Sequence, residues 1–303
     1  MPDPTAPEPA GLDPAAAIDR LRAAFRGPAA HRTLHAKGRF YAGTFTPTPE
    51  AGELCRAGHL RAPTPVLVRW SNAGGNAAVP DPTPDIRGMA VKFRLADGTA
   101  TDLLGQTSPR FPTDDPEEFV AMTEASVRPL TFPFFLARHP RLLPSVLASL
   151  RAHAVSAPVS FAEPAYFPIH AYGWLDDAGR RAWVRYAFVP QASAADRLPE
   201  RFEGPDRLFE EMAARLERGP VTHEVRVQVA GPGHDPHSAT SVWKGARELV
   251  AGHLVVHEPL PDQEADGPVV FDPTRVVDGI ELSDDPILRY RPAAYTESVS
   301  RRG

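Results

Sequence analysis

Two short strings near opposite ends of the chain hold side chains that could do chemistry. His35 lies in residues 32–38, which read Arg-Thr-Leu-His-Ala-Lys-Gly. An imidazole with a pKa of about 6.5 can accept a proton and return it within one catalytic cycle. Tyr295 comes four residues after Arg291, so the two share one face if the segment is helical. The positive charge of Arg291 would help this phenol to ionise, which would make Tyr295 an anionic oxygen ligand.

Four further strings accompany the histidine motif in a fixed order. Residues 68–72 read Val-Arg-Trp-Ser-Asn, and residues 84–93 read Pro-Asp-Ile-Arg-Gly-Met-Ala-Val-Lys-Phe. Residues 102–109 read Asp-Leu-Leu-Gly-Gln-Thr-Ser-Pro, and residues 284–295 read Asp-Asp-Pro-Ile-Leu-Arg-Tyr-Arg-Pro-Ala-Ala-Tyr. Together these blocks resemble the haem catalase family, which has His-Ala-Lys-Gly, Arg-Phe-Ser, Arg-Gly-Phe-Ala-Val-Lys-Phe, Asp-Leu-Val-Gly-Asn-Asn-x-Pro and Arg-x-x-x-Tyr in this order.

The resemblance spans about residues 30–302, with a looser match between about 125 and 265. The chain lacks the family's N-terminal arm and long C-terminal extensions, so it looks like the minimal branch of catalase-related peroxidases. The resemblance implies a haem b with Tyr295 as the protein's iron ligand. It also implies that Arg32, Arg69 and Arg302 bind the haem propionates and that Phe119 packs against the porphyrin. Arg291 completes the cofactor site as the positive charge beside Tyr295.

On the peroxide side, the resemblance assigns acid–base chemistry to His35 and its orientation to Ser71. The family's distal asparagine is replaced by Gln106, and Thr107 follows it. Glutamine keeps the amide donor but carries it one methylene further from the backbone. A displaced donor stabilises a transition state less well. We therefore expect oxidation of small organic donors by peroxide, with only weak dismutation of hydrogen peroxide.

Three other functions remain open at this point. A catalase-like protein can rearrange organic hydroperoxides or act as a tailoring enzyme in biosynthesis. A non-catalytic haem-binding protein would bind the cofactor without turnover. A haem-free β-barrel that binds an acidic small molecule would show no haem absorption.

The elements that must position these side chains follow from the local patterns. Asp13 and Pro14 begin a helix that ends near Gly27. Short β-rich runs fill residues 38–104, helical patterns follow over 116–125 and 133–152, and strands return at 166–172, 182–189, 223–229 and 248–257. A last helix is expected between Pro286 and Arg302. The predicted fold is α+β, an antiparallel β-barrel core with inserted and flanking helices.

Composition limits the other classes of function. The 303 residues are 42% hydrophobic and 23% charged, which is a globular composition. The proline-rich start predicts a disordered tail over 1–12, and the resemblance implies a single catalase-like haem domain over 13–303. A net charge of −5 leaves no basic footprint for nucleic acid, and no apolar segment is long enough for a membrane span. One cysteine predicts a cytoplasmic protein. The expected partners are peroxide and an organic electron donor, without a membrane, and a homo-oligomer stays open.

Overall fold

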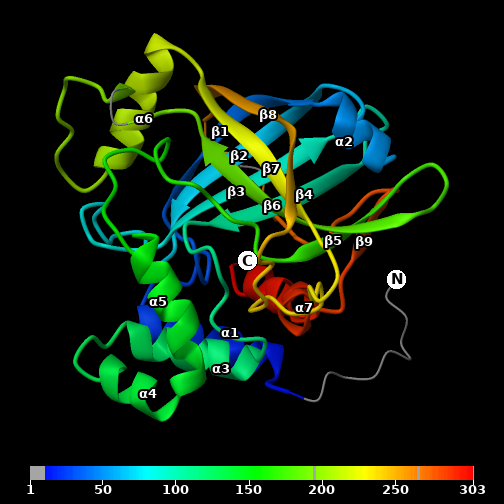
Figure 1. Ribbon diagram of the computed structural model, residues 1–303. Coiled ribbons are helices and arrows are strands. Elements are labelled where there is room, and N and C mark those ends of the chain that lie inside the picture. Colours follow the sequence, from blue (N-terminus) through cyan, green and yellow to red (C-terminus); the bar gives the residue numbers. More distant parts are fainter. Residues whose placement is uncertain (1–10, 194–195, 262, 265–266, 303) are drawn as a thin grey trace.

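A strongly curled antiparallel sheet forms the centre of the molecule (Figure 1). The computed structural model describes residues 11–193, 196–261, 263–264 and 267–302. These residues form nine strands in the order β4-β3-β2-β1-β8-β7-β6-β5-β9. The strands are β1 (Gly38–Pro47), β2 (Thr64–Asn72), β3 (Arg87–Arg94), β4 (Ala100–Gln106), β5 (Ala171–Leu175), β6 (Arg181–Pro190), β7 (Val221–Val229), β8 (Arg247–Pro259) and β9 (Ile280–Leu282). The predicted α+β fold with an antiparallel, barrel-like core is confirmed.

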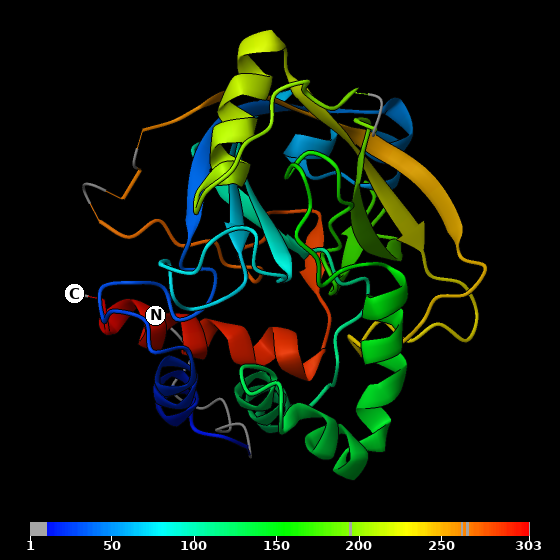
Figure 2. The same ribbon diagram turned by 90° about the vertical axis from the view of Figure 1, so that its left-hand side faces the viewer.

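Most helices gather at one end of this sheet (Figures 1 and 2). α7 runs beneath the sheet. α1 and α3 pack against α7 on the side that faces away from the sheet. α6 lies apart from them, against β8. The helices are α1 (Pro14–Phe25), α2 (Pro49–Leu54), α3 (Pro116–Ser126), α4 (Phe132–Arg138), α5 (Leu143–Arg151), α6 (Arg207–Arg218) and α7 (Pro286–Ser300). Among the described residues, no helix has the length and apolar character that crossing a bilayer requires.

α1 forms where the sequence predicts a helix, and it packs against α3 and α7. The Asp13 side chain accepts a hydrogen bond from the Ala16 amide at 2.9 Å, and Pro14 occupies the first turn. Its buried face carries Leu21, which packs with Val120 of α3. Of the tail predicted for residues 1–12, residues 1–10 lie outside the described residues.

Three details of the structure differ from the sequence prediction. The helix expected over 133–152 is broken into α4 and α5 because Pro140 lacks the amide hydrogen that would continue α4. The strand expected over 166–172 begins only at Ala171, and Tyr166 makes an isolated bridge to Phe188. None of α2, α6 and β9 was predicted.

Two buried histidines in the core make the fold sensitive to acid. His59 and His223 are 3% and 0% exposed, and burial lowers the pKa of each to about 4. Unfolded histidine titrates at about 6.5, so between these values the unfolded state binds protons that the folded state does not. We expect the free energy of unfolding to fall as the pH drops from about 6.5 towards 4, by up to about 1.4 kcal/mol per pH unit for each histidine. Urea unfolding at a series of pH values measures this, and an unchanged free energy between pH 7 and pH 5 would contradict it.

Candidate active site

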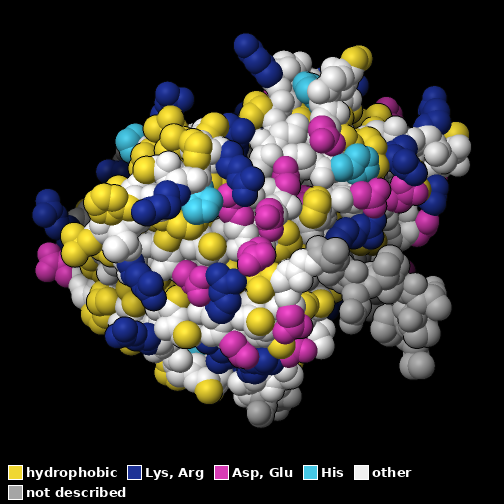
Figure 3. All heavy atoms as spheres, turned by 90° about the horizontal axis from the view of Figure 1, so that it is seen from below, with side chains coloured by type: hydrophobic (Ala, Val, Ile, Leu, Met, Phe, Trp, Pro, Cys, Tyr) yellow, Lys and Arg dark blue, Asp and Glu magenta, His cyan; other side chains and the backbone are white. Residues whose placement is uncertain are grey.

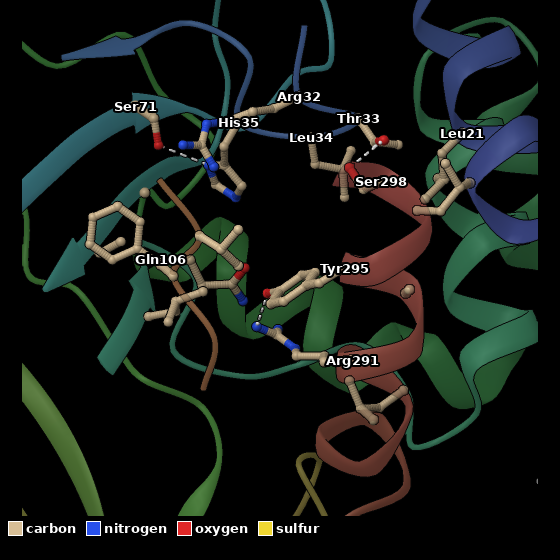
Figure 4. A pocket seen from close by; sticks show the side chains of 18 of the residues that line it. Leu21, Arg32, Thr33, Leu34, His35, Ser71, Gln106, Arg291, Tyr295 and Ser298 are labelled. Carbon is tan, nitrogen blue, oxygen red and sulfur yellow. Dashed lines mark hydrogen bonds between the residues drawn. The ribbon is translucent and has the colours of Figure 1, made fainter. Parts of the chain in front are cut away.

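A cavity of about 250 Å³ lies between the curled sheet and α7. This volume is close to the lower end of the range for small-molecule pockets, about 300 Å³. Figure 4 shows His35 and Tyr295 pointing into the cavity from opposite sides. All nine residues predicted for the site line it: Arg32, His35, Arg69, Ser71, Gln106, Phe119, Arg291, Tyr295 and Arg302. The structure therefore brings the whole predicted set together, while the role of each residue remains a prediction.

The backbone at His35 has an unusual conformation that its neighbours hold in place. His35 has a φ of 55°, a region that residues with a side chain rarely occupy. Its amide donates to the carbonyl of Ala73 at 2.9 Å, and its own carbonyl accepts from Nη1 of Arg69 at 3.0 Å. Nη2 of Arg69 donates to the next carbonyl, that of Ala36, at 3.3 Å. These bonds fix the direction in which the imidazole enters the cavity.

The ring of His35 is oriented and kept neutral by its surroundings. Nδ1 of His35 and Oγ of Ser71 form a hydrogen bond of 3.0 Å, as the resemblance implied. Burial lowers the pKa of His35 to about 3, and the positive charge of Arg69 acts in the same direction. At neutral pH the imidazole is therefore uncharged and able to accept a proton.

Gly88 of β3 leaves the space that the His35 ring occupies. A Cβ at this position would lie 2.6 Å from Cε1 and Nδ1 of His35 and 2.9 Å from Oγ of Ser71. All of these distances are too short for real Cβ atoms. The sequence analysis assigned no role to this glycine. Its signal in the sequence is the Arg-Gly pair at 87–88, which pairs with the serine strand in the sheet.

Substitution of Gly88 by alanine is expected to displace the imidazole and lower peroxide reactivity by about tenfold or more, since a shift of about 1 Å can cost this much. Gly219 is a matched control, because a Cβ there meets nothing within 4 Å. Initial rates with peroxide, compared at equal haem content, measure the effect. Equal rates for Gly88→Ala and Gly219→Ala would contradict the steric argument.

α7 carries the tyrosine side of the cavity. Asp285 caps the helix by accepting from the amide of Ile287 at 2.9 Å. Nη1 of Arg291 donates to the hydroxyl oxygen of Tyr295 at 3.2 Å. Pro292 lies inside this helix, and α7 continues through it to Ser300. The guanidinium therefore lies where a phenolate at Tyr295 would need positive charge.

The N-terminus of α7 is tied to the sheet by a buried pair that sequence reasoning missed. Nδ1 of His170 and Oδ2 of Asp285 lie 2.6 Å apart, and both residues are almost completely buried. Burial lowers the pKa of His170 to about 4, and the positive charge of Arg291 adds to this. The pair joins residues 115 positions apart. No local sequence pattern indicates a contact over this separation, so the pair could not be predicted from the sequence.

Two of the three predicted propionate ligands converge on a carboxylate within the chain. Nη2 of Arg32 donates to Oε1 of Glu264 at 2.7 Å, and Nη1 of Arg302 lies 3.4 Å from the same oxygen. The Nε atoms of both arginines are buried and have no hydrogen-bond partner among the described residues. Arg69 donates to the backbone carbonyls of His35 and Ala36. The contact with Glu264 shows that Arg32 and Arg302 together can bind a carboxylate. The sequence analysis did not identify Glu264.

The remaining walls of the cavity are mainly apolar. Phe119 stacks on Phe111 with ring centroids 4.7 Å apart. Gln106 lies at the end of β4 and lines the cavity, whereas the Thr107 hydroxyl donates to the carbonyl of Ala154. Apolar side chains from two strands and the loop before β9 complete the lining: Met89, Ala90, Leu104, Val270 and Phe271. Of the pair that replaces the family's two asparagines, only Gln106 lines the cavity.

These residues suit a haem. The group needs apolar walls for its porphyrin, guanidinium groups for its propionates and a protein ligand for its iron. The cavity offers aromatic and aliphatic walls, arginines that already hold a carboxylate, and the Tyr295 hydroxyl beside Arg291. No feature of the described lining conflicts with such a ligand.

Comparisons with known proteins agree with this arrangement. A family model described as Catalase matches residues 8–303. The chain is 42% identical over 303 residues to the catalase-related peroxidase of Mycolicibacterium paratuberculosis, covering 96% of this chain and 95% of that protein. It is 26% identical over 308 residues to the catalase-related peroxidase of Synechococcus elongatus, covering 96% and 89%.

The solved structure of a bacterial catalase has the same fold. It superposes with a TM-score of 0.77 at 23% identity, covering 99% of this chain and 64% of that chain. The catalase of Latilactobacillus sakei is 26% identical over 299 residues, which cover 62% of its length. The chain thus spans less than two thirds of these larger relatives and nearly all of the smaller ones. With the family model matching almost its whole length, this chain belongs to the catalase family, in its small catalase-related branch.

Proposed function

We propose that this chain uses peroxide to oxidise small organic donors at a haem held between His35 and Tyr295. The chain is a peroxide-using oxidoreductase of the catalase family, and family membership implies the haem cofactor. The observation that carries the finer proposal is the placement of an oriented, neutral imidazole opposite a tyrosine with an adjacent guanidinium. An acid–base group and an anionic oxygen ligand are the two protein groups that peroxide cleavage at a haem requires.

We propose haem b, bound through Tyr295, as the form of the cofactor. When bound, it supplies an iron that peroxide oxidises and that then draws electrons from a donor. Arg291 stabilises the phenolate of Tyr295 by donating to its oxygen. Arg32 and Arg302 hold propionates, and their contact with Glu264 supports this role because it is already a carboxylate contact. Phe119 and the apolar walls exclude water from the porphyrin faces.

His35 performs the proton transfer. Its neutral ring accepts the proton of the incoming peroxide oxygen and returns it to the leaving oxygen, so that the O–O bond breaks heterolytically. Ser71 holds the ring through Nδ1, which leaves Nε2 available for the peroxide. Arg69 keeps the histidine backbone in position. In this proposal Gln106 is the amide donor nearest to the reacting oxygens.

Two further assignments accompany this proposal. Residues 13–303 form one haem domain, because the cavity draws side chains from both ends of this range. The location is the cytoplasm, which the single cysteine favours.

The test compares the reactions that a haem of this kind supports. Purified protein is expected to oxidise an organic donor with hydrogen peroxide at least about tenfold faster than it releases oxygen from the same peroxide, since the shifted amide weakens the distal hydrogen bond. Gln106→Asn restores the shorter amide and is expected to raise oxygen release relative to donor oxidation. Oxygen-electrode and donor-oxidation rates on one preparation measure both.

Product analysis decides between this function and hydroperoxide rearrangement. An organic hydroperoxide that is reduced to its alcohol with matching donor oxidation supports the peroxidase. Conversion of the hydroperoxide to a rearranged product without donor consumption contradicts it. Haem binding without either reaction identifies a binding protein.

A further inference from the structure

We propose that α4 and α5 form a docking face for the surface of an anionic lipid membrane. The face consists of the exposed apolar and arginine side chains between residues 128 and 151, and it lies outside the active-site cavity. It does not depend on the proposed function. Lying on a membrane differs from spanning one, and needs only an apolar face with basic side chains at its edge.

α5 reverses the side-chain placement of an ordinary surface helix, with serines on its inner face and leucines on its outer face. Ser145 is only 4% exposed, and the hydroxyl of Ser149 is hydrogen-bonded to that of the buried Ser108. Leu147 and Leu150, by contrast, are 45% and 58% exposed. A surface helix normally places its apolar side chains inward and its polar ones outward. The outward leucines of α5 are therefore placed for an apolar partner.

α4 and the loop before it extend the same apolar face. Leu130 and Phe134 are 87% and 66% exposed, and none of the described residues of α4 is buried. Seen from below, the left part of the molecule shows many hydrophobic side chains with basic ones among them and fewer acidic ones (Figure 3). α4 and α5 project away from the sheet in Figure 1. Such a projecting apolar surface can enter the interfacial region of a bilayer without a matching concave partner.

The charge of this face has one sign. Residues 125–162 contain four arginines and no aspartate, glutamate or lysine, although the whole chain has a net charge of −5. Arg128, Arg138 and Arg151 are exposed and, within the described part of the chain, form no ion pair. A groove between α3 and α4 carries Arg128 and Arg138 beside Phe134, and its acidic lining residue, Glu124, is paired with Arg20. Arginine binds phosphate oxygens well, so this combination fits phospholipid headgroups above acyl chains.

Charge also argues against a second copy of the chain as the occupant. In a two-fold symmetric dimer the same patch lies on both sides of the interface. The arginines of one copy would then face those of the other, with no acidic side chain of residues 125–162 to pair with them. An anionic lipid surface supplies the missing negative charge.

Vesicle co-sedimentation of the full chain tests the proposal. We expect binding to phosphatidylcholine vesicles with about 30% phosphatidylglycerol, and weaker binding to pure phosphatidylcholine and at high salt. Leu147→Ser with Leu150→Ser is expected to weaken binding by at least about tenfold. Arg138→Gln with Arg151→Gln is expected to weaken it by about 25-fold, or about fivefold per arginine.

Matched controls come from elsewhere on the surface. Val242→Ser removes a side chain that is 57% exposed, and Arg94→Gln removes an exposed arginine of β3. Both should bind vesicles like the unaltered chain. The haem absorption spectrum and the unfolding midpoint of every variant report whether the fold is intact.

Each remaining outcome overturns the proposal. It fails if the unaltered chain does not sediment with anionic vesicles, if it binds neutral vesicles equally well, or if the controls lose binding to the same extent. Sedimentation equilibrium adds an independent outcome. A dimer that the leucine variant dissociates would assign the face to self-association, and an acidic protein partner that competes with vesicles only through Arg138 and Arg151 would assign it to that partner.

Discussion

Tyr295→Phe is expected to abolish stable haem binding and to lower peroxidase activity by about three orders of magnitude, or about 4 kcal/mol. The hydroxyl is the only part of this side chain that can bind iron, and phenylalanine keeps the ring but removes that ligand. The absorption spectrum should lose its phenolate-to-iron charge-transfer band. Haem content per chain and the rate of donor oxidation give independent measures of the loss.

The control for this substitution lies on the same helix. Tyr290→Phe removes a buried hydroxyl that has no hydrogen-bond partner among the described residues, so its haem content should stay close to that of the unaltered chain. Arg291→Gln should give an intermediate result, because it removes the charge beside the Tyr295 oxygen but not the oxygen itself. A Tyr295→Phe protein with a full haem complement and an unchanged spectrum would show that another side chain holds the iron.

His35→Gln is expected to keep the haem and lose about 10³-fold in the reaction with peroxide, the middle of the range for general acid–base catalysis. Glutamine can donate a hydrogen bond but cannot carry a proton between two oxygens. Ser71→Ala removes only the contact that orients the ring and should cost about tenfold or less, in keeping with one neutral hydrogen bond. Stopped-flow rates at several peroxide concentrations separate this reaction from donor oxidation.

Comparison of His35→Gln with Tyr295→Phe separates a role of His35 in proton transfer from a role in haem binding. If His35→Gln lost haem as completely as Tyr295→Phe, His35 would serve assembly of the site and not proton transfer. If it reacted with peroxide at the unaltered rate, the acid–base role would be wrong. For the unaltered protein, the peroxide reaction should not respond to titration of His35 between pH 5 and pH 8, because the pKa of His35 is about 3.

Local signals in the sequence predicted elements and site members well. Asp13 with Pro14 marks the start of α1, and Pro286 marks the start of α7. The spacing of Arg291 and Tyr295 predicted a contact on one helix face, and the resemblance to catalases identified the other members of the cavity. These successes share one property. Each depends on neighbours within a few residues or on motifs long enough to be specific.

What could not be predicted depends on contacts between distant segments. Gly88 matters because β3 lies under the imidazole, and only the paired strands reveal this. Glu264 and Arg32 are 232 positions apart, and no spacing rule connects them. The leucines on the outer face of α5 look like core residues in the sequence, since a one-dimensional pattern gives helical periodicity but not which side faces the protein.

The position of α7 in the chain has a consequence for how the protein matures. Thr33 and Ser298 share a hydrogen bond of 2.9 Å at the edge of the cavity (Figure 4) although 265 positions separate them. The side of the cavity that carries His35 is therefore synthesised long before the side that carries Tyr295. Until α7 docks against the segment that carries Thr33, only one side of the cavity exists, so a nascent chain without α7 cannot enclose a ligand between His35 and Tyr295.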